Sequence, residues 1–372
     1  MRYPKPLKKN GTIGFIAPSF GCAIEPYRSR FENAIKIFKE MGYDIYLGSN
    51  CYADSGIGIS NTPKLCAGEL NDTITGADAD VVITCGGGEL MCEVVPYIDF
   101  DRIKNSEPKW YMGYSDNTNY TFLSTILADT AAIYGPCAPA FGRVPWDRSI
   151  EDALKLLTCE ISEVHGYGMW EGVSGEGLED DNVSGVEKPE MVEAGSSGKK
   201  ENELVEPDPL EPYELTEKTE YKYYNCGASD RYAEFQGRLL GGCVDILTMH
   251  VGTKYDKVKE FLERYKDDGF IWFLECCDLN PLSIRRAFWQ MREAGWFKYA
   301  KGFLIGRPLH YGEEIMGVDQ YNAVTDIIGE LGVPIIMDLD IGHLPPMMPI
   351  ISGSIAKISA KDNDISIHYD FR

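Results

Sequence analysis

The sequence predicts an α/β protein built from two domains. The chain has 372 residues, of which 44% are apolar, and a chain of this length favours two domains over one. Its first 140 residues alternate apolar runs of strand length with amphipathic helical segments, a pattern typical of a parallel sheet with helices on its faces. The same kind of pattern returns after residue 235, following a stretch that lacks it.

The N-terminal domain is expected to span residues 1–146. Strands are predicted at 12–18, 43–47, 79–85 and 109–113, and helices at 28–41 and 117–127. The first helix places Phe31, Ile35 and Phe38 on one face and ends at Gly42, because glycine favours the position that follows a helix.

A linker region is expected at 147–235, and it carries an acidic insertion at 171–220. The insertion has sixteen acidic and four basic side chains, so it contributes −12 to the net charge of −22. It lacks the periodicity of a core segment. One interpretation is a solvated acidic surface, and the other is a flap at the mouth of a site that governs substrate choice. Trp170, at its leading edge, is either a contact that stacks on a substrate ring or a buried anchor.

The C-terminal domain is expected to span residues 236–372 as a second, β-rich α/β unit. Periodicity returns at 237–253, a helix is predicted at 255–265, and another begins at Pro281, a residue type that suits the first helical position. Strands are predicted at 270–275, 302–305 and 334–338, with a β-rich tail at 351–369.

Composition and charge argue against several functions. The net charge of −22 disfavours nucleic acid, which needs a basic footprint on the protein. No window approaches the roughly 20 apolar residues of a membrane span, and no signal peptide is readable, so a cytoplasmic protein is expected. The eleven scattered cysteines fit reduced thiols, and no metal site is expected even at the adjacent Cys276 and Cys277, because the chain has no CxxC motif.

Ser115 is the candidate nucleophile. In WYMGYSDNTNYTFL, a buried strand runs through Gly113 and Tyr114 into Ser115 and then into a helix. Such an elbow exposes a serine hydroxyl at the carboxyl edge of a sheet and places the next amide, that of Asp116, to donate to an oxyanion. The alternative is that Ser115 or Asp116 only caps the helix.

His343 is the preferred base among five histidines. It lies in DIGHLPPMMPI, an irregular segment after an apolar strand, whereas His165, His250 and His368 are expected to be structural. His310 is its rival.

Glu275 is the candidate for orienting the base. It ends the apolar strand FIWFL, and a carboxylate at the end of a buried strand needs a partner. Asp278 is the alternative for this role. A salt bridge from Glu275 to Arg285 or Arg286 is the structural interpretation.

The glycine run TCGGGE at 84–89 can supply a second oxyanion amide if its loop lies beside the elbow, because glycine lets backbone amides approach a ligand. Gly88 and Glu89 are therefore candidate substrate contacts. A phosphate loop is the weaker alternative, since no Walker sequence or GxGxxG is present in the run.

These residues together resemble the LD-carboxypeptidase family of serine peptidases, which includes the microcin C self-immunity proteins. PSFG, ITCGGGE, GYSDNT, YGP, GRLLGG, FLE, FLIGRP and IGH occur in the order expected for that family, over about residues 8–145 and 236–350. The resemblance implies a Ser115, Glu275 and His343 triad, with the amides of Gly87 and Asp116 as oxyanion hole. It also implies a flavodoxin-like N-terminal domain, a smaller C-terminal domain, no cofactor and a homodimer.

Two departures from the family pattern bear on the substrate. The loop after the glycines reads GELMCEVVPYID rather than the RGGYG type, which is more like the microcin-immunity branch, and the acidic insertion is longer than expected. The predicted function is hydrolysis of an amide bond in a small peptide, such as an LD-linked muropeptide. The alternatives are hydrolysis of peptidyl or aminoacyl nucleotides and, in another class, a catalytically silent binding module.

Overall fold

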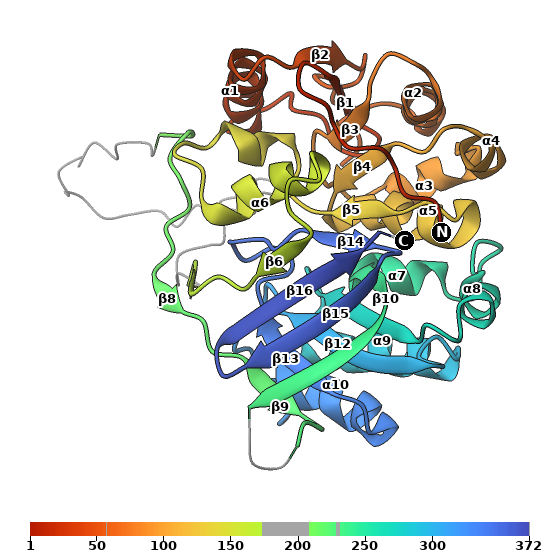
Figure 1. The fold of residues 1–372 in the computed structure, drawn as a ribbon, viewed down its shortest axis with the longest axis vertical. Coiled ribbons are helices and arrows are strands. Elements are labelled where there is room, and N and C mark those ends of the chain that lie inside the picture. Colours follow the sequence, from red (N-terminus) through yellow and green to blue (C-terminus); the bar gives the residue numbers. More distant parts are fainter. Residues whose placement is uncertain (57, 173–207, 228–230, 372) are drawn as a thin grey trace, which may run out of the picture.

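The computed structural model describes residues 1–56, 58–172, 208–227 and 231–371. These residues form a six-stranded sheet, an eight-stranded sheet and a short two-stranded one. Helices pack against both large sheets. The six-stranded sheet lies in the upper half of the view in Figure 1, and the eight-stranded sheet lies in the lower half. The predicted α/β class, with a parallel-sheet N-terminal region and a β-rich second region, is confirmed.

The first sheet has the strand order β14-β5-β4-β3-β1-β2. The strands from β1 to β5 pair in parallel, and this order is that of flavodoxin-like folds. β14, from the C-terminal part of the chain, adds antiparallel to β5. The strands are β1 (Thr12–Ile16), β2 (Asp44–Leu47), β3 (Val81–Thr84), β4 (Trp110–Gly113), β5 (Ala132–Tyr134) and β14 (Ile350–Ser352).

Helices cover both faces of this sheet because successive side chains of its buried strands point to opposite sides. In β3, Val81 and Ile83 face α1 and α6, whereas Val82 faces α2, α4 and α5. The helices are α1 (Tyr27–Glu40), α2 (Pro63–Thr75), α3 (Met91–Val94), α4 (Phe100–Asn105), α5 (Thr118–Ala128) and α6 (Arg148–Leu157). Three short 3-10 helices lie at Val95–Tyr97, Ser115–Asn117 and Ala138–Gly142 among these described residues.

The second sheet has the order β6-β16-β15-β10-β11-β12-β13-β9. Its central strands β10 to β13 are parallel, and antiparallel strands flank them on both sides. The strands are β6 (Glu163–His165), β9 (Lys222–Tyr224), β10 (Tyr232–Cys243), β11 (Phe270–Glu275), β12 (Ala300–Gly306), β13 (Ile335–Leu339), β15 (Ile355–Lys361) and β16 (Asp364–Asp370).

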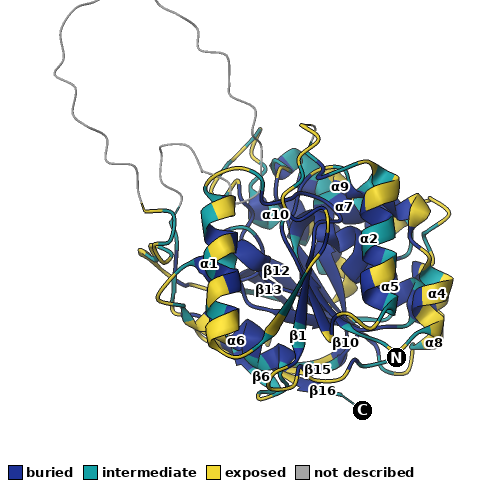
Figure 2. Ribbon diagram, turned by 90° about the horizontal axis from the view of Figure 1, so that it is seen from above, coloured by how far each residue is buried: buried dark blue, intermediate teal, exposed yellow. Residues whose placement is uncertain are grey.

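Four helices pack against one face of the second sheet, with their exposed sides turned to solvent (Figure 2). They are α7 (Val244–His250), α8 (Val258–Arg264), α9 (Pro281–Glu293) and α10 (Gln320–Ile328), and a 3-10 turn at Gly329–Leu331 follows α10. As predicted, α9 begins at Pro281; the side chain of Asn280 accepts a hydrogen bond from the amide of Ser283 and so caps the helix. In the described residues, no helix is long and apolar enough to cross a membrane.

The region at 147–235 contains more regular structure than the sequence predicts. α6 lies at its start, and β7 (Met169–Trp170) pairs with β8 (Glu217–Lys218), so the two ends of the acidic insertion meet. The flap hypothesis concerns mainly residues 173–207, which lie outside the described residues.

A buried ion pair supports the loop that follows β13. Arg307 and Asp340 are almost fully buried, and Nη2 of Arg307 lies 2.7 Å from Oδ1 of Asp340. Asp340 also accepts hydrogen bonds from the amide of Tyr167 at 2.8 Å and the hydroxyl of Tyr221 at 3.2 Å. Its carbonyl accepts the amide of Met348 at 2.6 Å, which closes the loop between the two residues.

We expect Asp340→Ala to lower the free energy of unfolding by about 3–5 kcal/mol, because the change leaves the buried Arg307 guanidinium without its carboxylate. Asp326→Ala is the control, since its ion pair with Arg285 is exposed and its loss should cost no more than about 1 kcal/mol. Denaturant unfolding of both variants measures the difference. Equal losses would contradict this account of the loop.

Candidate active site

Ser115 lies on a strained turn at the carboxyl end of β4. Its φ is +61°, an uncommon conformation for a non-glycine residue that costs about 1–3 kcal/mol. Gly113 permits the turn, because a Cβ at that position would lie 2.5 Å from Oγ1 of Thr84. The N-cap position is taken by Tyr114 in the 3-10 turn and by Asn117 in α5. Neither Ser115 nor Asp116 therefore caps the helix that follows.

The structure brings Ser115, His343 and Glu275 together. Nε2 of His343 lies 3.0 Å from Oγ of Ser115, and Nδ1 of His343 lies 2.9 Å from Oε2 of Glu275. The side chains of His343 and Glu275 are buried, and Ser115 is 6% exposed. The serine follows β4 of the first sheet, whereas Glu275 ends β11 and His343 follows β13 of the second.

The rival residues lie elsewhere. The ring of His310 is 3.3 Å from Glu313 and largely exposed. Arg285 pairs with Asp326, and Arg286 donates to Ser283, whereas the carboxylate of Glu275 is hydrogen-bonded to His343. Within the described residues, the side chain of Asp278 accepts a long contact of 3.8 Å from Sγ of Cys277, whereas Glu275 is the carboxylate that contacts the ring of His343.

The other histidines lie apart from this group. His165 in β6 and His368 in β16 both approach Glu163. His250 is buried at the end of α7, and its burial lowers its pKa to about 4, so it stays neutral at physiological pH.

Tyr134 is a member of this group that sequence reasoning alone does not single out. Its hydroxyl donates to Oε1 of Glu275 at 2.5 Å and accepts a hydrogen bond from the amide of Ser115 at 3.2 Å. The tyrosine therefore links the proposed nucleophile's backbone to the carboxylate. The available signal is its place at the end of β5, directly beside β4, within the YGP motif.

Gly342 allows His343 to reach Glu275. Its φ is +111°, and a Cβ at this position would lie 2.6 Å from Oε2 of Glu275. Any side chain here would therefore push the loop that carries His343 away from the carboxylate of Glu275, or force the backbone into a strained conformation.

The glycine run lies beside the elbow, as the oxyanion hypothesis requires. Nδ2 of Asn117 donates to the carbonyl of Gly86 at 2.8 Å, and the carboxylate of Asp116 accepts the amide of Met91 at 2.9 Å. Among the loops and turns of the described residues, no backbone carbonyl accepts the amide of Gly87. Gly88 is buried beside Ser19, and the backbone amide of Glu89 donates to Gly58.

Trp170 packs in a small cluster that adjoins the site. Its ring lies 5.0 Å from that of Tyr311 and 4.7 Å from the guanidinium of Arg307, and it belongs with Cys277 and Leu344 to one hydrophobic cluster. Trp170 is 7% exposed, which suits a buried anchor. Its role as a substrate contact stays a prediction.

The protonation of His343 is set by opposing effects. Burial of the imidazole lowers its pKa, but the adjacent Glu275 carboxylate raises it, and the pKa lies well above the ordinary value. The imidazolium is the form that the carboxylate stabilises. In the described part of the chain, no group of three or more His, Cys, Asp or Glu residues is arranged to hold a metal ion.

This fold and site define a serine peptidase-like protein, and two family descriptions identify it further. The LD-carboxypeptidase N-terminal domain matches residues 13–135, and the LD-carboxypeptidase C-terminal domain matches residues 236–358. The chain therefore belongs to the LD-carboxypeptidase family, as its motifs predict.

Individual relatives agree with this assignment. The chain is 25% identical to the microcin C7 self-immunity protein MccF of Escherichia coli, over 97% of this chain and 94% of that protein. It is also 25% identical to a candidate carboxypeptidase of Vibrio cholerae, over 94% and 92% of the two chains. A solved structure of MccF in complex with glutamyl sulfamoyl guanosine has the same fold, with a TM-score of 0.73 at 21% identity, and the similarity covers 99% of this chain and 98% of that one.

We expect Tyr134→Phe to lower kcat/KM about 10- to 100-fold, because it removes the donor to Oε1 of the buried Glu275 carboxylate. Tyr369→Phe is the matched control, since it also removes a buried tyrosine hydroxyl, one that donates to the carbonyl of Pro349. Steady-state kinetics of both variants test the assignment. An unchanged rate in Tyr134→Phe would show that Glu275 is positioned without the phenol.

The pH profile should report the raised pKa of His343. A general base must be neutral, and the Glu275 carboxylate favours the charged imidazolium, so the acidic limb of kcat/KM should have its midpoint above the ordinary histidine value of about 6.5. Glu275→Gln should move that limb to lower pH and reduce the maximal rate. Asp278→Asn should leave the limb in place, and a shift in that variant instead would transfer the role to Asp278.

Proposed function

We propose that this chain is a serine hydrolase that cleaves an amide bond of a small peptide, such as an LD-linked muropeptide, in the manner of a carboxypeptidase. The observation that carries this proposal is the hydrogen-bonded series Ser115–His343–Glu275, with the serine on a strained strand–turn–helix elbow. Nucleophilic serines on unrelated folds are activated by the same arrangement of base and carboxylate.

In the proposed mechanism, Nε2 of His343 takes the proton of the Ser115 hydroxyl as Oγ attacks the amide carbonyl. Glu275 holds Nδ1–H of the ring, which fixes the tautomer and stabilises the imidazolium. The amides of Gly87 and Asp116 donate to the developing oxyanion. His343 then returns the proton to the leaving amine. In the second half of the reaction, His343 takes a proton from water as the water oxygen attacks the acyl carbonyl, and it gives that proton to Oγ of Ser115 as the ester bond breaks.

The small exposed fraction of Ser115 supports a small substrate. Only 6% of the residue is exposed, and the two side chains behind it are buried, so the reacting carbonyl must enter a confined site. Such a site excludes water around the ion pair and strengthens its electrostatic effect. The homodimer, the cytoplasmic location and the domain limits remain predictions.

A second candidate is hydrolysis of an aminoacyl or peptidyl nucleotide. The similarity to the microcin C7 self-immunity protein over 97% of this chain favours it. Solved structures of MccF contain glutamyl sulfamoyl guanosine and aspartyl sulfamoyl adenosine. The same serine chemistry would cleave the amide-like bond of such a conjugate, so the two candidates differ in what the site recognises beyond the acyl group.

We expect Ser115→Ala to lower turnover by about 10⁴- to 10⁶-fold with the fold preserved, as removal of a nucleophilic serine does in other triads. Ser49→Ala, which changes an exposed serine, is the control. Mass spectrometry of products from a murein tetrapeptide and from an aminoacyl sulfamoyl adenosine compares the two substrate classes. A silent binding module would turn over neither compound and would bind one of them equally well with or without the Ser115 hydroxyl.

A further inference from the structure

The side chain of Asp116 makes contacts that the proposed mechanism does not use. Asp116 directly follows the proposed nucleophile and is 1% exposed. Its carboxylate accepts hydrogen bonds from the hydroxyl of Ser19, from the amide of Met91 at 2.9 Å and from Nδ2 of Asn119 at 2.8 Å. A buried carboxylate needs such donors, because leaving it unpaired is costly. Two of the three, Ser19 and Met91, come from segments that adjoin the glycine run.

Ser19 and its neighbour lie directly against the glycine run. A Cβ at Gly88 would collide with the hydroxyl oxygen of Ser19, so the backbone of Gly88 packs on that hydroxyl. Phe20 donates its amide to the carbonyl of Gly87 at 2.9 Å. Met91 begins α3 two residues after the run ends. The same carboxylate is therefore hydrogen-bonded both to the segment that packs on the run and to the residue that leads out of it.

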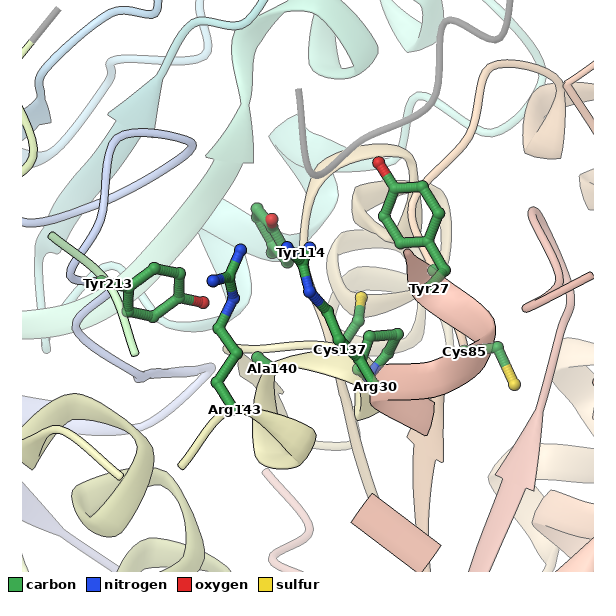
Figure 3. A pocket seen from close by; sticks show the side chains of 10 residues that line it. Tyr27, Arg30, Cys85, Tyr114, Cys137, Ala140, Arg143 and Tyr213 are labelled. Atoms are coloured by element: carbon green, nitrogen blue, oxygen red, sulfur yellow. The ribbon is translucent and has the colours of Figure 1, made fainter. Parts of the chain in front are cut away.

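The glycine run and the elbow border the same space. Cys85 and Gly86 of the run and Tyr114 of the elbow line a pocket that encloses about 350 Å³, part of it open to solvent (Figure 3). Nδ2 of Asn117 joins the two segments through its hydrogen bond of 2.8 Å to the carbonyl of Gly86. An oxyanion formed at Ser115 needs donors from both segments within about 2.7–3.1 Å of one point. The relative position of the two segments therefore decides how well they stabilise it.

Asp116 belongs to both halves of the proposed oxyanion hole. Its amide is the proposed donor of the elbow, and its carboxylate holds the segments around the other donor, the amide of Gly87. A carboxylate suits this role because its two oxygens accept several hydrogen bonds at once, and hydrogen bonds to a charged acceptor are strong. Burial raises the pKa of this carboxyl, and the hydrogen bonds from Ser19, Met91 and Asn119 oppose that shift.

We propose that Asp116 is a positioning residue whose carboxylate sets the distance between the two oxyanion donors, its own amide and that of Gly87. The proposal rests on the proposed amide hydrolysis at Ser115 and goes beyond it by giving a role to a side chain outside the triad. The oxyanion exists only in the tetrahedral state of the reaction. An error in the distance between its donors should therefore affect kcat rather than binding of the ground state.

The first test compares Asp116→Asn with Glu69→Gln in the full chain. Asparagine has one acceptor oxygen in place of two, so one of the three donors then faces an amide NH2. On a murein tetrapeptide, kcat should fall about 10- to 100-fold, while KM changes by less than about threefold. Glu69 is the matched control, because its carboxylate accepts the amides of Ala17 at 2.9 Å and Asn50 at 2.8 Å at the same edge of the sheet. Its variant should keep the wild-type kcat.

Ser19→Ala is a milder variant for use if Asp116→Asn folds poorly. It removes one donor and leaves the carboxylate in place, so kcat should fall in the same way but by a smaller factor. The double variant should lose less than the product of the two single losses, because both changes act on one contact. Losses that multiply would show that the two residues act separately, which overturns the proposed route through Ser19.

A murein tripeptide with a boronic acid at the cleavage position separates this proposal from the proposed function. Its boron accepts an electron pair from Oγ of Ser115, whose proton passes to His343, and the tetrahedral adduct places a boron-bound oxygen where the oxyanion would lie. Calorimetry should show that Asp116→Asn weakens boronate binding by about 10- to 100-fold. Tetrapeptide binding in the Ser115→Ala background should not change when Asp116→Asn is added.

The outcomes distinguish the two proposals. Selective weakening of the boronate supports the positioning role even if the wild-type chain cleaves no peptide, in which case the hydrolase proposal alone fails. Equal weakening of boronate and tetrapeptide would overturn the positioning role and leave the hydrolase intact, since Asp116 would then only support the fold. An unchanged kcat in Asp116→Asn, or an equally large loss in Glu69→Gln, would overturn it as well.

Discussion

The carboxylate of Glu275 is the group on which the geometry of the site depends. It is 1% exposed, and a buried carboxylate is costly unless each oxygen finds a donor. One oxygen lies 2.9 Å from Nδ1 of His343, and the other accepts the hydroxyl of Tyr134. The hydrogen bonds to this carboxylate therefore fix the imidazole of His343, which follows the second sheet, and the hydroxyl of Tyr134, which ends a strand of the first. The Tyr134 hydroxyl also accepts a hydrogen bond from the amide of Ser115. Because Gly342 has no side chain, the loop that carries His343 can come close enough to Glu275 for this hydrogen bond.

Parallel strand pairing explains why residues far apart in the sequence meet here. The carboxyl ends of parallel strands lie at one edge of a sheet, so the segments after β1, β3 and β4 gather at the same edge of the first sheet. The carboxyl ends of β11 and β13 gather in the same way at the edge of the second. Ser115, the glycine run and the segment around Ser19 come from the first edge, and Glu275 and His343 come from the other. The site is the place where these two edges face each other.

Much of this arrangement can be predicted from the sequence, because strong local signals mark its parts. Buried strands such as β11 are continuous apolar runs, and Ser115 and Glu275 lie at the ends of such runs. Tyr134 escapes prediction because a tyrosine at the end of an apolar strand looks like core, and its role depends on the neighbouring strand. The pairing of β14 with β5 is equally hidden, since a three-residue strand from the far end of the chain carries no local signal for its partner. α6 has a clear amphipathic pattern, with Ile150, Ala153 and Leu157 on its buried face, so the linker expected from residue 147 begins instead with a regular helix.

The two sheets are held together by more than the polar contacts of the site. Both large hydrophobic clusters contain side chains from each sheet: one includes Phe15 and Phe273, and the other includes Val82 and Trp272. The end of β10 also packs on the start of α5, where the amide of Cys243 donates to Oγ1 of Thr118. A hydrogen bond of 3.0 Å between Ser115 and His343 tolerates little sliding between the elements that carry them. A densely packed core resists such sliding because its interdigitated side chains leave few alternative arrangements. The apolar residues shared between the sheets, distant from this contact, therefore set the precision with which Ser115 meets His343.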